Sequence, residues 1–278
     1  KKDFSSAKSA FLRVLQIDSK NAFALVQLTT LSLQTNDKKQ ALEYAKRLSS
    51  TYPSEFEAQS LLGIAYLENK DMNQGIKALK KANALKPNDV NTQINLVRAA
   101  MVVKDYQTAF KFANKLTVVF PKDAQLRMTA AYAAEKCNQK TDAIKHYEAA
   151  SNLPGAQIPA LREHGRLYGV SGQDAKSTNA LKRLLKLDKG NYQANMIIGR
   201  KLYMTNNLVK AEPYFAMALK KNPDSAEPSM FLALIKVRTK HPDVAFKYAQ
   251  AALNKAPKNK SVLEVYTYVQ ENRKMYDN

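Results

Sequence analysis

The segment Phe56–Asp89, FEAQSLLGIAYLENKDMNQGIKALKKANALKPND, contains the pattern that decides the fold. It has two apolar stretches with helical spacing, which are separated by the polar pair Lys70-Asp71 and followed by Pro87. Apolar residues three and four positions apart lie on one face of a helix, whereas proline cannot continue a helix. The segment therefore predicts helix A, a tight turn, helix B and a second turn within 34 residues.

The same phase recurs along the chain. The prolines of this phase are Pro53, Pro87, Pro121, Pro223 and Pro257, and Gly155 and Lys189 occupy the two positions between them. Small residues precede this position by 12 residues, at Ala7, Ala41, Gly75, Ala109, Ala143, Ser177, Ala211 and Ala245. A second, mostly small position precedes it by 24 residues, at Thr29, Gly63, Val97, Ala131, Gly165, Gly199 and Ala233. Glycine is unfavourable in a helix interior, so this pattern predicts close contact between helices A and B.

Polar turns separate the two helices of each unit. They are Asn36-Asp37, Lys70-Asp71, Lys104-Asp105, Gly172-Gln173 and Asn206-Asn207. We expect Asp37, Asp71 and Asp105 to be N-caps, because a short carboxylate accepts hydrogen bonds from the first backbone N–H groups of a helix. Gln40 and Gln74 then complete a capping-box pattern.

This pattern resembles the tetratricopeptide repeat family over essentially the whole chain. Two repeats match its motif most fully, at Leu62, Gly63, Tyr66, Gly75, Leu79, Ala82 and Pro87, and at Ile198, Gly199, Leu202, Ala211, Phe215, Ala218 and Pro223. The resemblance implies an all-α fold, a right-handed α-solenoid of helix-turn-helix repeats in one superhelix close to a full turn.

The register predicts one solenoid domain over residues 1–278. Its seven full repeats are 22–55, 56–89, 90–123, 124–157, 158–191, 192–225 and 226–259. Residues 1–21 read as a preceding helix B and residues 260–278 as a terminal helix A, so we expect a fragment of a longer chain. Residues 153–159 interrupt one turn between repeats. A longer turn with Pro159 in the first turn of the next helix is the preferred interpretation, and a bend between two stacks is the alternative.

The charge balance restricts the class of partner. The chain has 44 Lys and Arg against 24 Asp and Glu, a formal net charge of +20. Such a charge favours acidic partners: an acidic protein, nucleic acid, an anionic membrane surface or an anionic polymer. No apolar run is long enough to cross a membrane. The single cysteine, Cys137, is expected to be a small core residue and does not decide the compartment.

Residues suited to catalysis are sparse. His146, His164 and His241 have no Cys or carboxylate at metal-ligand spacing, and His164 occupies a leucine position of the repeat, which predicts a core or half-buried histidine. The glycines lack the strand–turn–helix setting of a phosphate-binding loop. We therefore expect no enzyme activity, no metal and no cofactor.

The family resemblance implies a binding groove lined by helix A. Read onto this sequence, its ligand-facing positions hold five of the eight methionines and several arginines. The predicted partner-binding residues are Arg98, Met101, Met128, Tyr132, Arg162, Arg166, Met196, Arg200, Tyr203, Met204, Met230 and Arg238. Flexible thioethers suit an adaptable groove, and the planar guanidinium suits carboxylates and phosphates.

Several of these residues also have a structural interpretation. Met and Tyr at helical spacing also suit packing between repeats, which is the preferred interpretation for them. Glu135 and Glu163 are placed to neutralise part of the arginine cluster. The lysine pairs on helix B are expected to form a solvated convex face, at Lys38-Lys39, Lys80-Lys81 and Lys220-Lys221.

The resulting hypothesis is a protein–protein interaction scaffold that binds an acidic peptide or protein in a Met/Arg-lined groove. The alternative is an electrostatic binder of nucleic acid or anionic polysaccharide, and a third is self-assembly. The carboxylate clamp of chaperone-binding members is absent apart from Asn95, and the strict 34-residue period argues against 35-residue RNA-reading repeats.

Residues 153–168 resemble tetratricopeptide lipoproteins of PEP-CTERM/exosortase exopolysaccharide systems. This resemblance implies a bacterial periplasmic or envelope location. Scaffolds of polysaccharide exporters are similar.

Overall fold

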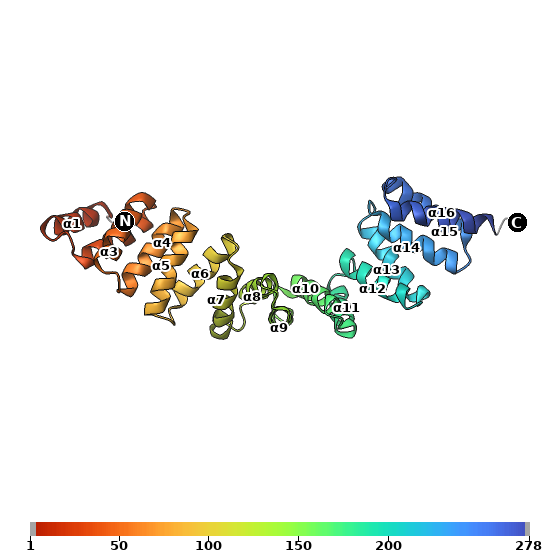
Figure 1. Cartoon of the computed structure of the whole chain (residues 1–278), viewed down its shortest axis with the longest axis horizontal. Helices are drawn as coiled ribbons and strands as arrows, with labels where there is room; N and C mark the ends of the chain where they lie inside the picture. The colour runs from red at the N-terminus through yellow and green to blue at the C-terminus, as the bar shows by residue number, and fades with distance from the viewer. Residues whose placement is uncertain (1–3, 276–278) are drawn as a thin grey trace. The chain divides into compact units, whose positions relative to one another are not determined.

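The computed structural model describes residues 4–275, which form sixteen α-helices and no strands (Figure 1). The helices that follow the predicted B phase are α1 (Phe4–Ile17), α3 (Lys38–Thr51), α5 (Met72–Leu85), α7 (Tyr106–Val119), α9 (Lys140–Ala150), α11 (Asp174–Leu187), α13 (Leu208–Lys221) and α15 (Pro242–Lys255). Those of the A phase are α2 (Ala22–Gln34), α4 (Phe56–Glu68), α6 (Val90–Val102), α8 (Ala124–Lys136), α10 (Gln157–Val170), α12 (Tyr192–Met204), α14 (Ala226–Arg238) and α16 (Lys260–Lys274). The predicted all-α helical-repeat fold is confirmed.

Each A-to-B turn has the same backbone geometry. A residue with positive φ lies just after the end of helix A in each turn, at Asn36, Lys70, Lys104, Asn138, Gly172, Asn206 and Lys240. After α2, the Asp37 N–H donates to the carbonyl of Ser32 at 2.8 Å and the Asn36 N–H donates to that of Leu33 at 3.2 Å. This pair of bonds satisfies helix carbonyls that have no partner within the helix. The repeat therefore has a fixed turn conformation as well as a fixed length.

The predicted N-caps are confirmed. The side chains of Asp37 and Asp71 each accept a hydrogen bond at 3.2 Å, from the backbone N–H of Gln40 and Gln74. Asp105 accepts one from Thr108 at 3.1 Å. The reciprocal half of the capping box does not form at Gln40, whose buried Oε1 has no hydrogen-bond partner.

The small positions lie where helices A and B cross. A Cβ atom added to Gly63 would lie 2.5 Å from Leu79 Cγ, and one added to Gly165 would lie 2.7 Å from Leu181. These approaches leave no room for a side chain, as the pattern predicted. Ser177, which replaces the usual alanine, donates a 2.7 Å hydrogen bond from its hydroxyl to the Gly165 carbonyl.

The chain divides into two compact units, residues 1–153 and 154–278. Within each unit every helix packs against the next along the chain. At the start of the second unit, α10 begins after the long turn Ser151–Ala156 and has Pro159 in its first turn, as predicted, whereas the choice between a longer turn and a bend between two stacks stays a prediction. The turn is longer because α9 ends three residues earlier in the repeat than the other B helices. A single continuous superhelix stays a prediction.

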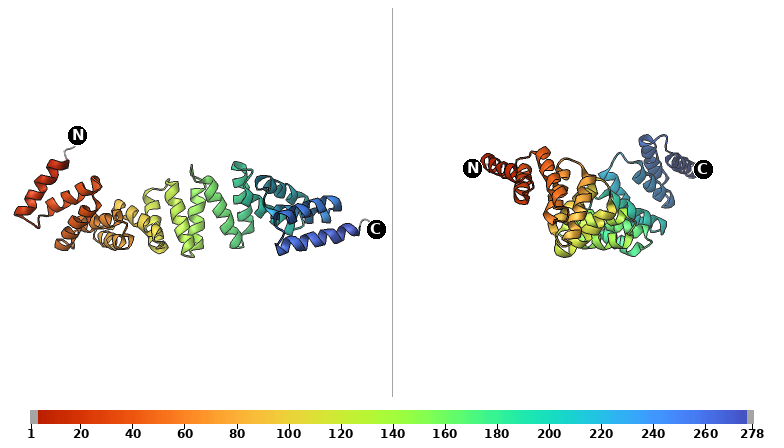
Figure 2. Two further views of the ribbon diagram at one scale, coloured as in Figure 1. Left: turned by 90° about the horizontal axis from the view of Figure 1, so that it is seen from above. Right: turned by 60° about the vertical axis from the view of Figure 1, so that its left-hand side comes forward.

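The last three helices of the second unit pack on one another. α14, α15 and α16 are all in mutual contact and lie side by side at the blue end of the chain (Figures 1 and 2). Val262 and Val269 of α16 are buried in this contact, whereas Leu263 is 43% exposed. Val265, Tyr266 and Val269 of α16 therefore pack against residues of α14 and α15.

Candidate functional site

A pocket opens between two successive A helices in each unit. We call these the first pocket (α6 and α8) and the second pocket (α10 and α12).

The first pocket lies within the N-terminal unit and has a volume of about 650 Å³. Its lining residues are Ile94, Val97, Arg98, Met101, Val102, Leu116, Phe120, Asp123, Gln125, Leu126 and Thr129. Most of them are apolar, and the only basic side chain among them is Arg98. The Arg98 guanidinium is exposed and has no hydrogen-bond or ion-pair partner within residues 4–275. This pocket therefore combines an apolar wall with the unpaired Arg98 and with the carboxylate of Asp123, the N-cap of α8.

The second pocket lies within the C-terminal unit and has a volume of about 210 Å³. Arg162, Arg166 and Arg200 line it together with Leu181, Tyr192, Gln193, Met196 and Ile197. Three guanidinium groups thus face a pocket about a third the size of the first one. The arrangement suits a compact anion better than an extended apolar segment.

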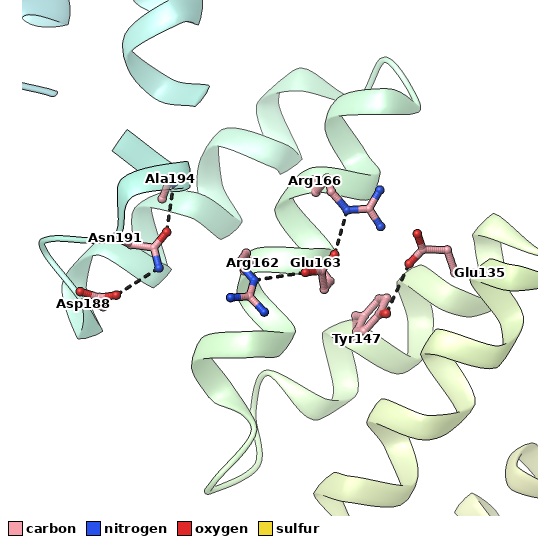
Figure 3. Close-up of polar contacts among 8 residues, drawn as sticks. All are labelled: Glu135, Tyr147, Arg162, Glu163, Arg166, Asp188, Asn191 and Ala194. Atoms are coloured by element: carbon pink, nitrogen blue, oxygen red, sulfur yellow. Dashed lines mark hydrogen bonds and ion pairs between the residues drawn. The ribbon is translucent and has the colours of Figure 1, made fainter. Parts of the chain in front are cut away.

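Carboxylates already pair with the arginines of the second pocket. Glu163 lies between Arg162 and Arg166 on α10, at 3.1 Å from the Nε of the first and 2.8 Å from the Nε of the second (Figure 3). A terminal nitrogen of Arg200 donates to Glu227 at the start of α14. The predicted neutralisation by Glu163 is therefore present. Glu135 belongs to the first unit, where its carboxylate accepts a 3.3 Å hydrogen bond from the Tyr147 hydroxyl.

The two pockets share four of their repeat positions. Arg98 has the same place in α6 as Arg166 has in α10, and Ile94 has the same place as Arg162. On the second helix of each pair, Gln125 corresponds to Gln193. Six of the twelve predicted partner-binding residues line one of the two pockets, namely Arg98, Met101, Arg162, Arg166, Met196 and Arg200.

The buried methionine of the predicted set has a packing role. Met196 is only 3% exposed and belongs to a core cluster with Phe215 and Leu232. Its buried position supports the structural interpretation of that residue, although it forms part of the wall of the second pocket. Met101 is half-buried and packs against the core of the first unit.

The other predicted binding residues lie outside both pockets. Tyr132 is 40% exposed and contacts Tyr106 edge to face at 5.8 Å, and Met204 is 82% exposed. Tyr203 packs edge to face on Phe231 at 5.4 Å. Arg238 lies over the Tyr203 ring and donates to Asn206 at 2.8 Å. Met128 and Met230 are half-buried. Their role in binding stays a prediction.

Two aromatic residues that line the pockets are not among the partner-binding residues predicted from the sequence. Phe120, at the end of α7, is 41% exposed and lines the first pocket. Tyr192, at the start of α12, lines the second pocket, and its hydroxyl lies 2.8 Å from the Ser225 hydroxyl. Both residues are large aromatics at helix ends, beside positions that were assigned to turns. Exposure at such an end depends on how far neighbouring A helices separate, which the repeat pattern does not report.

The candidate groups for chemistry are dispersed. Within residues 4–275, no three His, Cys, Asp or Glu side chains form a possible metal site, and no helix is long and apolar enough to span a bilayer. His164 is 4% exposed, as predicted, and contacts the Tyr168 ring at 4.5 Å. Cys137 is half-buried at the C-cap of α8 rather than in the core, and burial raises the pKa of its thiol.

His146 is the other buried histidine. It is 2% exposed in α9, its Nε2 lies 3.1 Å from Asn114 Oδ1, and its Nδ1 has no partner. Burial, with a smaller contribution from Arg127, lowers the pKa of this imidazole. It is therefore a neutral core residue near neutral pH and is not available as a surface base.

Comparisons with known proteins bear on the fold. The tetratricopeptide repeat model matches residues 30–90 and 162–226. A chain in the structure of Naa15/Naa10 bound to HypK-THB has a TM-score of 0.70 and 16% identity, with 94% of this chain and 41% of that chain covered. The C-terminal part of a repeat protein from Cytophaga hutchinsonii has a TM-score of 0.62 and 13% identity, with 86% and 98% covered. A MamA structure (AMB-1) has a TM-score of 0.52 and 18% identity, with 62% and 94% covered.

These similarities establish the fold alone, because the identities are low. The chain spans less than half the length of the Naa15/Naa10 complex chain that it matches. No curated protein sequence matches it, and the resemblance to exopolysaccharide lipoproteins is not confirmed. The fold is typical of protein–protein interaction scaffolds. The repeat pattern, the helices and the model match agree over residues 30–90 and 162–226, which match the tetratricopeptide repeat.

Proposed function

We propose that the chain is a non-enzymatic scaffold that binds peptide segments of partner proteins, with each of the two pockets as a separate site. The observation that carries this proposal is the repetition of four repeat positions in two separate pockets between A helices. The first pocket offers an apolar surface, and the second offers arginine side chains. A peptide segment with an apolar side chain therefore suits the first pocket, and one with an acidic group suits the second.

The first pocket supports the apolar part of this proposal. Val102 is 61% exposed, and Ile94 and Phe120 are 37% and 41% exposed, so apolar area remains available for burial. Burying apolar area contributes roughly 25 cal/mol per Å² before the costs of association. The unpaired Arg98 beside this area adds a preference for a carboxylate next to the apolar group.

The second pocket supports the acidic part. Arg162 and Arg166 are each a little over 40% exposed at the side chain, so solvent reaches both guanidiniums. The Nη groups of Arg162 have no partner within residues 4–275. A ligand anion can therefore approach the arginines without unfolding the helix that carries them.

Peptide selection with charge-reversal variants tests the proposal. Peptides selected on the wild-type protein from a displayed random library are measured by fluorescence anisotropy. We expect them to combine apolar and acidic residues, and we expect Arg162→Glu with Arg166→Glu and Arg200→Glu to weaken their binding by at least about tenfold, or 1.4 kcal/mol. Circular dichroism checks that the variant remains helical.

The matched control carries the same change of charge on the B helices. Lys39→Glu, Lys81→Glu and Lys220→Glu alter three exposed lysines outside both pockets. This variant should bind within about twofold of the wild type. If the control loses as much affinity as the arginine variant, the basic surface as a whole binds anions and the polymer-binding alternative is favoured. A steep fall of binding with salt for both proteins would give the same answer.

A further inference from the structure

We infer that the second pocket selects a phosphorylated side chain of the partner peptide over a carboxylate side chain. This inference rests on the proposed function and assigns the chemical class of the acidic group. The observation behind it is that Glu163 and Glu227 of the chain itself already pair with all three arginines of the pocket. A ligand must therefore compete with two internal carboxylates.

The geometry of the internal pairs defines the competition. Glu163 uses one oxygen for each neighbouring arginine, and both contacts are made to Nε (Figure 3). Its side chain is 26% exposed, less than either arginine. Glu227 reaches Arg200 from the next A helix, α14. Both carboxylates are held close to their partners by the fold, so their effective concentration is high without any loss of translational freedom.

A carboxylate ligand gains little under these conditions. It would exchange one monoanion for another around the same guanidinium group, and it would also have to meet the entropic cost of association. The free energy of pairing for an exposed ion pair is small in any case. Aspartate and glutamate side chains of a partner are therefore expected to bind this pocket weakly.

A phosphate monoester carries more negative charge and more acceptor oxygens than a carboxylate, and both favour binding to these arginines. Near neutral pH it carries a charge of about −1.5 to −2 and three acceptor oxygens. The planar guanidinium donates in pairs to such oxygens. Three guanidinium groups line the pocket, so more than one of them can donate to the same phosphate. A dianion that bridges two or three guanidiniums can therefore replace the internal carboxylates, whereas a monoanion cannot bridge them as fully.

The size of the pocket agrees with a compact anion. Its volume is about 210 Å³, against about 650 Å³ for the first pocket. Tyr192 and Ile197 supply an apolar wall beside the arginines. This space suits the end of one side chain.

Two small probes test the inference on the full chain. N-acetyl phosphoserine amide and N-acetyl glutamate amide are titrated at pH 7.5 and constant ionic strength, and binding is followed by the NMR signals of the arginine Nε–H groups. We expect the phosphoserine probe to bind at least about tenfold more tightly, or 1.4 kcal/mol, and to move the signals of Arg162 and Arg166. Equal affinity, a preference for the glutamate probe or shifts confined to other arginines would overturn the inference.

Removal of the internal competitor gives a sharper test. Glu163→Gln removes the carboxylate that Arg162 and Arg166 share, so we expect the glutamate probe to bind more tightly and its disadvantage to shrink to about threefold or less. Glu227→Gln removes the carboxylate that pairs with Arg200 and so gives a second, independent test. Glu148→Gln, an exposed residue of the first unit, changes the net charge equally and should leave the ratio unchanged. A ratio that is the same in all four proteins would contradict competition by Glu163 and Glu227.

Failure of the phosphate inference can be distinguished from failure of the proposed function. If selected peptides depend on the three arginines but the probes show no phosphate preference, the scaffold proposal stands and the phosphate inference fails. If the selected peptides bind independently of the arginines, the proposed function fails at the second pocket, and a phosphate preference there would then describe a site for a free anion.

Discussion

The first and second pockets have equivalent positions in the repeat and different chemistry. Each lies between two successive A helices, one pair in each unit. Where α6 presents Ile94, α10 presents Arg162, and the resulting pocket changes from mainly apolar to arginine-rich. The 34-residue phase therefore determines which positions face the opening, and the residue at each position determines what the opening can bind.

The two pockets also differ at one further position. In the first pocket this position holds Val97, whose side chain lines the wall. In the second it holds Gly165, which packs closely against Leu181 of α11. A leucine of the intervening B helix lines each pocket, Leu116 in the first and Leu181 in the second. The comparison predicts that substitutions at this position change stability and pocket shape together.

Gly165→Ala should have the largest effect of the substitutions considered. The added Cβ would lie 2.7 Å from Leu181, so Leu181 or the helix must move, at a cost of about 1–3 kcal/mol. Gly169→Ala in the same helix is the control, because its Cβ would meet only Ser177 Oγ at 3.4 Å. We expect that control to raise stability by up to about 1 kcal/mol through helix propensity. Urea unfolding distinguishes them, and equal effects would remove the packing argument.

His146 gives the first unit a pH dependence. Its pKa is lowered in the folded protein, mainly by burial, so the unfolded chain binds the proton more tightly. Stability is therefore complete above the unfolded pKa of about 6.5 and falls as the pH drops below it, by at most about 1.4 kcal/mol per pH unit. We expect His146→Asn to flatten this dependence between pH 6.5 and 5 in thermal unfolding. An unchanged slope in the variant would assign the pH dependence to other groups.

The repeat phase predicted the helices and turns but not the pockets. Regular small residues such as Ala41 and Gly63 report helix crossings, because a larger side chain there would collide with the neighbouring helix. The distance between successive A helices depends on many side chains at once, so no single position reports it. Ion pairing was predictable only for Glu163, which is a sequence neighbour of its partners, whereas Glu227 reaches Arg200 from another repeat.

The turns give the smallest and most direct comparison of the two units. Lys104 after α6 and Gly172 after α10 occupy the same turn position, with φ of 62° and 71°. A side chain is strained in this left-handed conformation, and glycine is not, although glycine also makes the unfolded chain more flexible. Lys104→Gly should therefore stabilise the first unit by about 0.5–1 kcal/mol, and Gly172→Lys should destabilise the second by a similar amount. Opposite shifts in the urea midpoint would support the shared turn geometry, whereas shifts of the same sign would show that the lysine side chain makes a compensating contact.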